Sequence, residues 1–572
     1  MASKSNRPRA AACALAAFTV SLAAGCASLP SNSDPHVLRQ YNPEAASAPV
    51  ITPEAGREPD LLLRDFYSAT AIPSADYEAA RAFLTPQAAA AWDPSGDMLV
   101  VDRIGVTTLP GGTAARRKFS VHGTVVGALG TGGAYRPERG TYEATIELEQ
   151  SGGEWRISSL PAGVVLERTE LRNQYQPYNL YFFDAQGQEL VTDRRWVYSR
   201  RETLPSALLS LIMEGPAQRL QPAVSSILPA GASYTGLQDG AYTFSGFGGV
   251  SEPDRQRFAA QVVWTLASAG ITGPFTLKAD GAPLLVDAQT LGTDDFVELS
   301  PLVQAAGEST LFSLADGHVS RVESATPTAV AGELGASGDV QSAEITNEGT
   351  WAAVFKDERG ASLRAGELGG AARELQRAET FTRPSVEPEA NAVWTVADGT
   401  RILRSVQSSA TGELTTAEIA AELPEGVHGS ISVLRLSRSG ARVVMVIDGH
   451  LYTGIVERRA PGERAVVGVQ EYAQELGGTV VAADWQPDGS LIVGTSSSAS
   501  PVLRVEQDGS STTVLSVGNI SAPVVAVAAS PTMLYVTDAN AVLQLPAAGA
   551  DNPLWREVPG LEGVRSVPIL SK

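Results

Sequence analysis

The C-terminal half of the chain carries a short apolar run that returns about every 40 to 50 residues. The runs are TLFSL, AAVF, VWTV, VVMV, LIVG and LYVT, and they lie near Leu311, Ala352, Val393, Val443, Leu491 and Leu534. Polar turns such as Pro487-Asp488-Gly489 flank several of them. Repeats of this length that hold only strands and turns are typical of a β-propeller, because a single blade cannot bury its faces alone.

Residues 305–572 are therefore predicted to form an all-β propeller of about six blades, with five or seven blades as alternatives. The last apolar stretch, GVRSVPIL, is expected to close the ring by pairing into the first blade. The alternative interpretation of the same pattern is an all-β sandwich in which the spacing of the runs is accidental.

Residues 58–168 begin with a helical period and then change to a period of two. EPDLLLRDFYSATA places Leu61, Leu62 and Phe66 on one helical face, and Ser74 is a candidate N-cap for a second helix in SADYEAARAFLTPQAAAAW. The following segments, from DMLVVDRIGVTTL to GEWRISSLP, predict strands joined by glycine-rich turns. Two helices followed by a long curved meander resemble the cone-shaped, α+β NTF2-like fold, which often contains a pocket.

Residues 176–288 mix strands and helices. TLPSALLSLIMEGP predicts a helix that ends at Gly215, and DRQRFAAQVVWTLASAG predicts one that ends at Gly270. Asp239-Gly240 is typical of a tight hairpin turn. The order of elements resembles that of the α+β GerMN domain, and so do the sequence segments LYFFD, ILPAG, DGAYTF and LKADGAPL. This resemblance implies a binding or assembly module and assigns no catalytic residue; the chain departs from the family pattern at TFSGFGG.

The first 25 residues combine a basic head with a short apolar run. Lys4, Arg7 and Arg9 precede AACALAAFTVSLAAG, which is shorter than the ~20 residues needed to span a bilayer. Small residues and a cysteine follow in SLAAGCASLP. That order resembles a bacterial lipobox and implies a lipoprotein signal peptide at 1–25, with a diacylglycerol thioether and an N-acyl group such as palmitate on Cys26. The alternative is an ordinary cleaved signal with an incidental cysteine.

Residues 26–57 are rich in Pro, Ser, Ala and Asn and have no apolar period, which predicts a lipidated, flexible tether. The formal net charge of −20 predicts repulsion from nucleic acid and from anionic lipid headgroups, so no nucleic-acid partner is expected. Two acyl chains hold a protein at a membrane where one chain holds it weakly. We therefore expect a lipid-anchored protein at the extracytoplasmic face of the cell membrane.

The sequence predicts no catalytic, cofactor or metal site. The five histidines are His36, His122, His318, His428 and His450. None has metal-ligand spacing to another histidine or to a cysteine, and the chain has no G-x-S-x-G, phosphate-loop or HExxH motif. The paired carboxylates Asp294 and Asp295 lie in LGTDDFVEL, where solvated linker charges are the favoured interpretation. Cys26 is thus the one site residue that the sequence predicts.

Together, a lipobox, an NTF2-like unit, a GerMN unit and a propeller resemble the actinobacterial lipoprotein LpqB family over nearly the whole chain. The resemblance implies a regulator and not an enzyme. Such a regulator binds the extracytoplasmic domain of an MtrB-like sensor histidine kinase and tunes the MtrA–MtrB two-component system, which controls cell-wall homeostasis and division.

Two alternatives stay open. An envelope sensor would bind a cell-wall fragment in an apolar pocket of the NTF2-like or GerMN unit, with a few converging polar groups. A propeller-borne cell-wall hydrolase or lyase would instead cluster carboxylates or histidines in the central channel.

Overall fold

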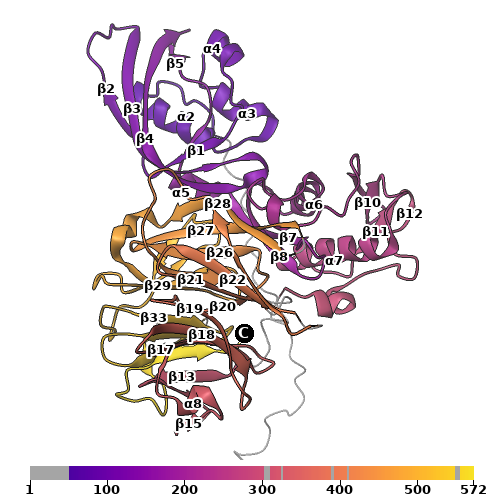
Figure 1. Cartoon of the computed structure of the whole chain (residues 1–572). Coiled ribbons are helices and arrows are strands. Elements are labelled where there is room, and N and C mark those ends of the chain that lie inside the picture. Colours follow the sequence, from indigo (N-terminus) through magenta and orange to yellow (C-terminus); the bar gives the residue numbers. More distant parts are fainter. Residues whose placement is uncertain are drawn as a thin grey trace, which may run out of the picture. The chain divides into compact units, whose positions relative to one another are not determined.

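The computed structural model of the protein describes residues 51–301, 309–323, 326–387, 392–408, 411–460, 462–547 and 554–572. The expected signal peptide, Cys26 and most of the expected tether lie outside these residues. Contacts join residues 51–572 into one unit, and the colours of Figure 1 follow this unit along the chain from indigo to yellow. In the described ranges, every helix is too short or too polar to cross a membrane.

The first domain packs a curved sheet against short helices (Figure 1). Its strands follow the order β5-β4-β3-β1-β6, and β2 pairs with β3. Along β3, buried Phe119, Val121 and Val125 alternate with more exposed residues, so one face of the sheet forms the core with the helices. The elements are α2 Pro59–Ala69, α3 Ser74–Arg81, α4 Pro86–Ala91, β1 Met98–Val101, β2 Gly105–Thr108, β3 Arg116–Leu129, β4 Tyr135–Ser151, β5 Glu154–Ser159, β6 Val165–Glu167 and α5 Arg168–Gln174.

The helices of this domain differ from the sequence prediction in three details. Leu61 is exposed on α2, and Leu63 is buried in its place. Pro73 is the N-cap of α3, so Ser74 is the first helical residue and not the cap. The expected second helix is two helices, because Pro86 has no N–H to continue the hydrogen bonds of α3. Thr85 caps α4 instead, and its hydroxyl accepts a hydrogen bond from the Ala88 N–H at 3.2 Å.

The end of the expected tether, residues 51–57, contacts the first domain. The Gly56 N–H donates to Glu154 Oε2 at 2.9 Å, and the Arg57 guanidinium binds Asp65 at 2.8 Å. Contacts with the folded body therefore begin before the start of α2 at Pro59.

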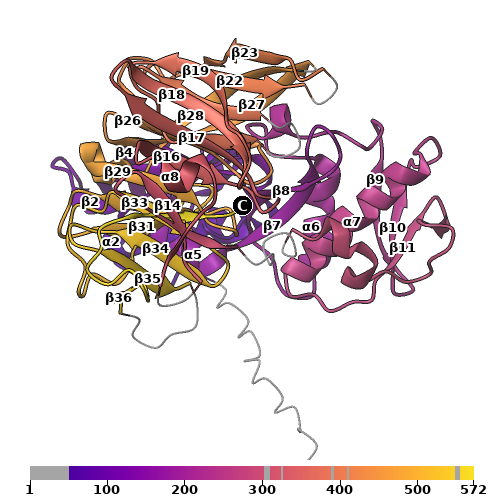
Figure 2. The ribbon, with the colours of Figure 1, turned by 60° about the horizontal axis from the view of Figure 1, so that its bottom comes forward.

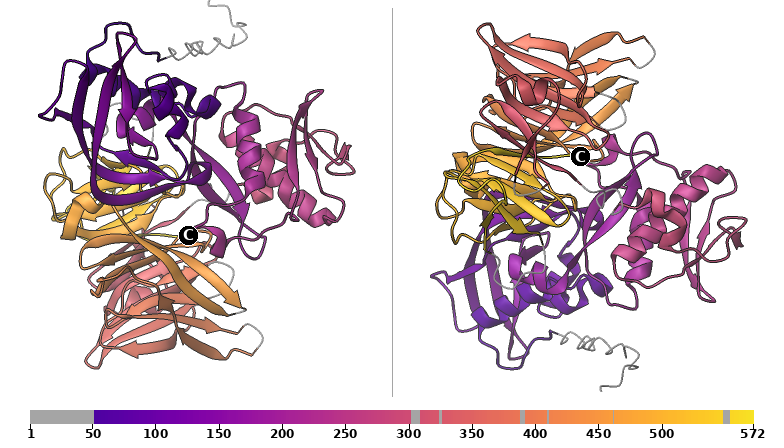
Figure 3. Two further views of the ribbon diagram at one scale, coloured as in Figure 1. Left: turned by 90° about the horizontal axis from the view of Figure 1, so that it is seen from above. Right: turned by 90° about the horizontal axis from the view of Figure 1, so that it is seen from below.

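The second domain has the α+β organisation expected of residues 176–288. Its four-stranded sheet has the order β12-β11-β10-β9, and both views of Figure 3 show the helices α6 and α7 beside it. Gly215, with φ of 93°, ends α6, as predicted. The elements are β7 Gln176–Phe183, β8 Leu190–Val197, α6 Leu204–Glu214, η3 Gln221–Ala223, β9 Ser233–Gln238, β10 Ala241–Ser245, α7 Glu252–Ser268, β11 Thr276–Ala279, β12 Ala282–Pro283 and η4 Thr293–Leu299.

The described part of the chain beyond residue 310 forms six sheets of four or five strands, which are the blades of a propeller (Figure 2). All six apolar runs of the sequence are the second strands of blades, and nearly every residue in them is buried. The first three blades contain β13 Leu311–Ala315, β14 His318–Arg321, β15 Thr328–Ala329, α8 Glu333–Ala336, β16 Val340–Ile345, β17 Thr350–Asp357, β18 Gly360–Glu367, β19 Arg373–Ala378, β20 Ser385–Glu387, β21 Ala392–Ala397, β22 Arg401–Gln407 and β23 Leu414–Glu418.

The remaining blades contain β24 Ala420–Ala421, β25 Ile431–Leu436, β26 Arg442–Ile447, β27 His450–Ala460, β28 Glu463–Tyr472, β29 Val480–Trp485, β30 Leu491–Thr495, β31 Val502–Val505, β32 Thr512–Val514, β33 Ala526–Ala529, β34 Met533–Thr537, β35 Val542–Pro546 and β36 Arg556–Glu557. The last strand, β37 Val567–Leu570, returns to the first blade and pairs antiparallel with β13, so that Val567 lies opposite Leu314. The predicted closure by the terminal apolar stretch is thereby confirmed.

Candidate functional site

Those residues considered from the sequence that the structure describes do not come together in one site. Cys26 lies outside the described residues, so its lipidation stays a prediction. His450 Nδ1 lies 2.8 Å from Glu471 Oε1, and His318 Nδ1 lies 3.1 Å from the Gly335 carbonyl oxygen. Each histidine thus has a local partner within its own blade region. Among the described residues, no group of three His, Cys, Asp or Glu side chains could hold a metal ion.

Asp295, the second of the paired carboxylates, and the histidine of the first domain make local contacts, whereas Asp294 is exposed. Asp295 Oδ2 accepts a hydrogen bond from the Gly292 N–H at 2.7 Å and so caps η4. His122 is exposed on β3, where its ring lies against the backbone of Gly105 in β2. Neither arrangement places an acid beside a base around a space for a substrate.

The first strands of the blades bring charged side chains together in the middle of the propeller. Glu344 Oε2 of β16 lies 2.5 Å from Arg435 Nη2 of β25 and 3.2 Å from Arg383 Nη2. Asp484 of β29 accepts hydrogen bonds from Lys572 Nζ at 2.7 and 3.0 Å. The two halves of the cluster meet where Arg435 Nε lies 3.6 Å from Asp484 Oδ1.

Electrostatics keep both carboxylates of this central cluster ionised. Burial by itself would raise the pKa of Asp484, but attraction from Lys572 and then from Arg435 holds that pKa well below its usual value. Burial would also raise the pKa of Glu344, but attraction from Arg435, Lys572 and Arg383 together lowers it below its usual value. A general acid or base works best when its pKa is near the operating pH. These carboxylates are therefore fitted to hold blades together and not to exchange protons.

A second buried charge cluster joins the third blade to the fourth. Glu387, at the end of β20, is 2% exposed. It accepts hydrogen bonds from Trp394 Nε1 at 2.9 Å, from Arg404 Nε at 2.5 Å and from Arg464 Nε at 3.0 Å. Because Arg464 belongs to β28, the carboxylate ties the outer part of the fourth blade to the third. Trp394 and Arg404 come from the same blade as Glu387 and Arg464 comes from the next one, so the carboxylate is fully occupied in joining strands and blades.

An arginine anchors the second domain to the fourth blade. Arg219, in the segment between α6 and η3, donates from Nη1 to the Tyr472 hydroxyl at 2.7 Å. Its Nη2 donates to the Thr453 carbonyl at 2.8 Å, and its Nε donates to the Gly468 carbonyl at 3.0 Å. The guanidinium also lies over the Tyr472 ring, 5.5 Å from the centroid. The side chain thus satisfies three acceptors on β27 and β28 at once.

Further polar contacts extend this interface to the fifth blade. Arg194 of β8 pairs with Glu506 at 3.1 Å and with Asp508 at 3.4 Å. Trp196 Nε1, also from β8, donates to Asp508 Oδ2 at 3.0 Å. From the fourth blade, Gln470 Nε2 donates to the Pro137 carbonyl of the first domain at 2.8 Å. The fourth and fifth blades therefore contact both N-terminal domains.

An apolar cluster lies beside these polar contacts. Its buried members come from both the second domain and the fourth blade, and they are Val191, Leu220, Ala223, Ala441 and Ile455. Burying apolar side chains between two domains favours one fixed arrangement of those domains. The interface thus combines an apolar centre with arginine hydrogen bonds around it.

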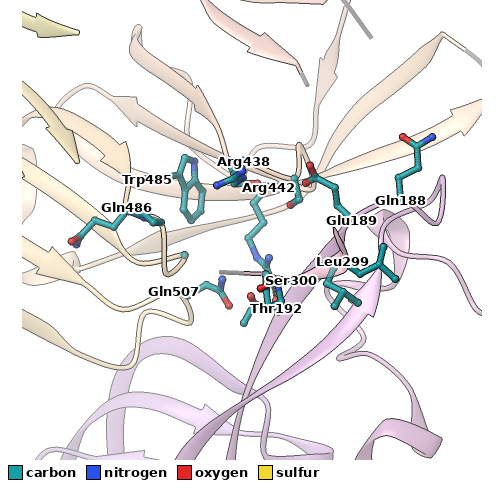
Figure 4. A pocket seen from close by; sticks show the side chains of 16 residues that line it. Gln188, Glu189, Thr192, Leu299, Ser300, Arg438, Arg442, Trp485, Gln486 and Gln507 are labelled. Carbon is teal, nitrogen blue, oxygen red and sulfur yellow. Dashed lines mark hydrogen bonds between the residues drawn. The ribbon is translucent and has the colours of Figure 1, made fainter. Parts of the chain in front are cut away.

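A pocket of about 70 Å³ opens within this interface (Figure 4). Its walls come from the β7–β8 turn and β8, from the residues after η4, and from turns of the fourth and fifth blades. Figure 4 shows Arg442 extending from the propeller towards Thr192 and Ser300 of the second domain. A pocket for a drug-sized ligand is ~300–1,000 Å³. This pocket is therefore suited to a few waters or to a small ion and not to a cell-wall fragment.

A larger and more open cavity of about 350 Å³ lies between the third and fourth blades. Its wall includes Asp398, whose Oδ1 accepts hydrogen bonds from the N–H groups of Glu379 and Thr380. That carboxylate is therefore occupied by backbone donors of its own blade.

Sequence reasoning missed the central cluster, although a signal was present. Glu344, Arg435 and Asp484 each occupy the same place in the first strand of a blade, in VQSAEI, ISVLRL and VVAADW. A charged residue inside an otherwise apolar strand needs a partner when it is buried. The interdomain arginines and the pocket carried no such local signal, because their partners lie more than 200 residues away.

Three family models match the chain, in the order of the three domains. The model described as "Lipoprotein LpqB, N-terminal domain" matches residues 52–172. The model described as "Sporulation and spore germination" matches residues 179–285, and the model described as "Lipoprotein LpqB beta-propeller domain" matches residues 317–571.

Curated relatives match nearly the full length. The Lipoprotein LpqB of Corynebacterium diphtheriae is 40% identical over 561 residues, which cover 96% of each chain. The Lipoprotein LpqB of Rhodococcus jostii is 36% identical over 572 residues, which cover 96% of this chain and 95% of the relative. Among solved structures, a streptogramin B lyase matches with a TM-score of 0.31 and 12% identity, over 42% of this chain and 76% of that chain. That last similarity is too low to support an argument about this chain.

Proposed function

The chain belongs to the lipoprotein LpqB family, and from this we propose that it is a membrane-anchored, extracytoplasmic regulator of a sensor histidine kinase. In this proposal it binds the extracytoplasmic domain of an MtrB-like kinase. It thereby modulates a two-component system that controls cell-wall homeostasis and division, and it does so without catalysing a reaction of its own.

The observation that carries the proposal is the family match, which extends over 96% of the chain and preserves the order of all three domains. The geometry of the propeller is consistent with it. The central carboxylates Glu344 and Asp484 are occupied by arginine and lysine partners, and Glu387 is occupied by two arginines. A body whose buried charges hold blades together is suited to presenting a fixed surface to a partner.

Binding to the kinase is tested by titration calorimetry. The purified lipoprotein, in detergent, is titrated with the extracytoplasmic domain of the MtrB-like kinase from the same organism at physiological salt. We expect saturable heat with a Kd in the micromolar range or below, about −8 kcal/mol or stronger. The extracytoplasmic domain of an unrelated sensor kinase is the control. Equal heats for both domains, or none for either, would remove the kinase from the proposal.

Anchoring is tested by substituting the lipobox cysteine. We expect Cys26→Ser to lack the acyl mass in mass spectrometry and to leave the membrane fraction, because the thioether cannot form. Cys13→Ser is the matched control, since that cysteine lies in the expected signal peptide. Retention of Cys26→Ser in the membrane with an unchanged lipid mass would contradict lipidation at this position.

A further inference from the structure

The pocket between the second domain and the propeller contains a cation without a carboxylate partner. Arg442 is partly buried, and its Nη2 donates to the Thr192 carbonyl at 2.6 Å. Within the described ranges, its guanidinium makes no ion pair. Asp193, which attracts it electrostatically, is instead bound by Arg195 at 2.8 Å and by the Ala217 N–H at 2.8 Å. A partly buried guanidinium with one neutral acceptor has donors left for a ligand.

A second guanidinium lies at the mouth of the same pocket. Arg438 is exposed, belongs to the turn that leads into β26, and forms no hydrogen bond with a described residue. Glu189, from the β7–β8 turn, also lines the pocket and attracts Arg438. The charged lining residues are therefore two arginines and one glutamate, which is a local excess of positive charge in a chain of net charge −20.

The walls of the pocket are held in place by the interface. The Asp184 carboxylate accepts hydrogen bonds from the Gln188 N–H at 2.7 Å and the Glu189 N–H at 3.0 Å, which fixes the β7–β8 turn. Trp485 Nε1 donates to the Arg435 carbonyl at 3.0 Å and so holds the wall formed by the fifth blade. A rigid, polar wall lowers the entropy lost when a small ligand binds.

The size of the pocket restricts the ligand. A volume of about 70 Å³ holds a few waters or one small ion. Guanidinium groups present paired N–H donors whose geometry matches the oxygens of phosphate and carboxylate groups. Figure 4 shows the amide of Gln507 directed towards the same space as Arg442, which supplies a further neutral donor.

We propose that this pocket binds one small tetrahedral oxyanion of the phosphate or sulfate class, held by Arg442 and Arg438. Such an ion would contact the second domain and two blades together, so its binding would stabilise their arrangement. The proposal does not depend on kinase binding, because it concerns a contact inside the protein.

The test is titration calorimetry of the full protein in detergent with sodium phosphate and with sodium sulfate at constant ionic strength. We expect saturable binding with a Kd of about 1 mM or tighter, and a rise in unfolding temperature with either salt. Sodium chloride is the reference and is expected to give neither effect. A third titration with sn-glycerol 3-phosphate separates the two sources of phosphate: tighter binding of this ester indicates a lipid headgroup, and weaker binding indicates a free ion.

Substitutions of the two arginines test whether phosphate binds in this pocket. Arg438→Gln removes one guanidinium without removing a hydrogen bond to the protein, and we expect it to weaken phosphate binding by about tenfold or more. Arg442→Gln is expected to abolish binding, and Arg438→Gln keeps the test valid if Arg442→Gln fails to fold. Arg401→Gln, at an exposed pair of the third blade, is the matched control. Absence of saturable binding to the unmodified protein, or equal affinity in the Arg438→Gln and Arg401→Gln variants, would overturn the proposal.

Discussion

At the scale of single residues, Lys572 shows how one charge supports a buried carboxylate. Its Nζ lies 2.7 Å from Asp484 Oδ1, and the side chains are 34% and 1% exposed. Removing one partner of a buried ion pair leaves the other charge buried and uncompensated. The resulting loss of folding free energy is larger than the stabilisation that the intact pair provides. The nearest remaining cation, Arg435, has its Nε at 3.6 Å from the carboxylate.

We therefore expect Lys572→Met to lower the free energy of unfolding by about 2 kcal/mol, measured by urea denaturation. Lys356→Met is the matched control, because Lys356 is an exposed lysine of the second blade. We expect that control to unfold at the same urea concentration as the unmodified protein. If the two variants were equally stable, the ion pair with Asp484 would not contribute to stability.

The same cluster predicts how stability depends on pH. The pKa values of Asp484 and Glu344 are lower in the folded protein than in the unfolded chain. Their stabilising contribution is therefore complete at pH values above about 5, where the unfolded chain is also ionised. It is lost progressively as the pH falls below about 4, since the unfolded chain then binds protons that the folded state does not.

We expect the unfolding temperature to be level between about pH 6 and 8 and to fall on acidification below about pH 4. Asp484→Asn, measured by calorimetry over the same pH series, should be less stable at neutral pH and should lose less stability on acidification. An unchanged acid slope in this variant would show that other carboxylates dominate the response.

At the scale of elements, a repeated turn connects the second and third strands of several blades. Asp398 and Asp448 each have positive φ and precede a glycine with positive φ. Their carboxylates also accept backbone hydrogen bonds from the segment before the first strand of the same blade: Asp448 Oδ1 binds the Ser430 N–H at 2.9 Å. One dipeptide therefore sets both the hairpin and the start of the blade.

We expect Gly449→Ala to be more damaging than the same change in an open turn of the same type. Gly449 has φ of 79°, and a Cβ there would lie 2.4 Å from the Gly478 carbonyl oxygen. Gly240 has φ of 77° with open space around it. Chemical denaturation should show a loss of about 1 kcal/mol for Gly240→Ala and about 3 kcal/mol for Gly449→Ala. Similar losses for both variants would mean that backbone strain, and not the contact with Gly478, sets the loss of stability.

At the scale of the whole molecule, the second domain and the propeller are expected to unfold together because Arg219 and the apolar cluster join them. We predict that Arg219→Ala separates their unfolding into two calorimetric transitions, since it removes hydrogen bonds to Tyr472, Thr453 and Gly468 together. Arg401→Ala, at an exposed surface pair, should leave one transition. A single unchanged transition in Arg219→Ala would show that the apolar contacts by themselves keep the unfolding of the two parts coupled.

Much of the fold was predictable because its signals are local. The six apolar runs, the glycine that ends α6 and the hairpin at Asp239-Gly240 each depend on a few neighbouring residues, and the structure places all of them as expected. The departures are local as well: Pro73 and not Ser74 caps α3, and Pro86 separates two helices where the period predicts one.

The sequence by itself determined the kinds of elements and their order, because hydrophobic period and turn chemistry act within a few residues. Only the tertiary structure decided which buried charges pair, where the domains contact one another and where the pocket lies. Arg442 and Thr192 are 250 residues apart, and no local pattern relates two such positions. Their contact follows from closure of the ring and from the packing of the second domain against the fourth and fifth blades.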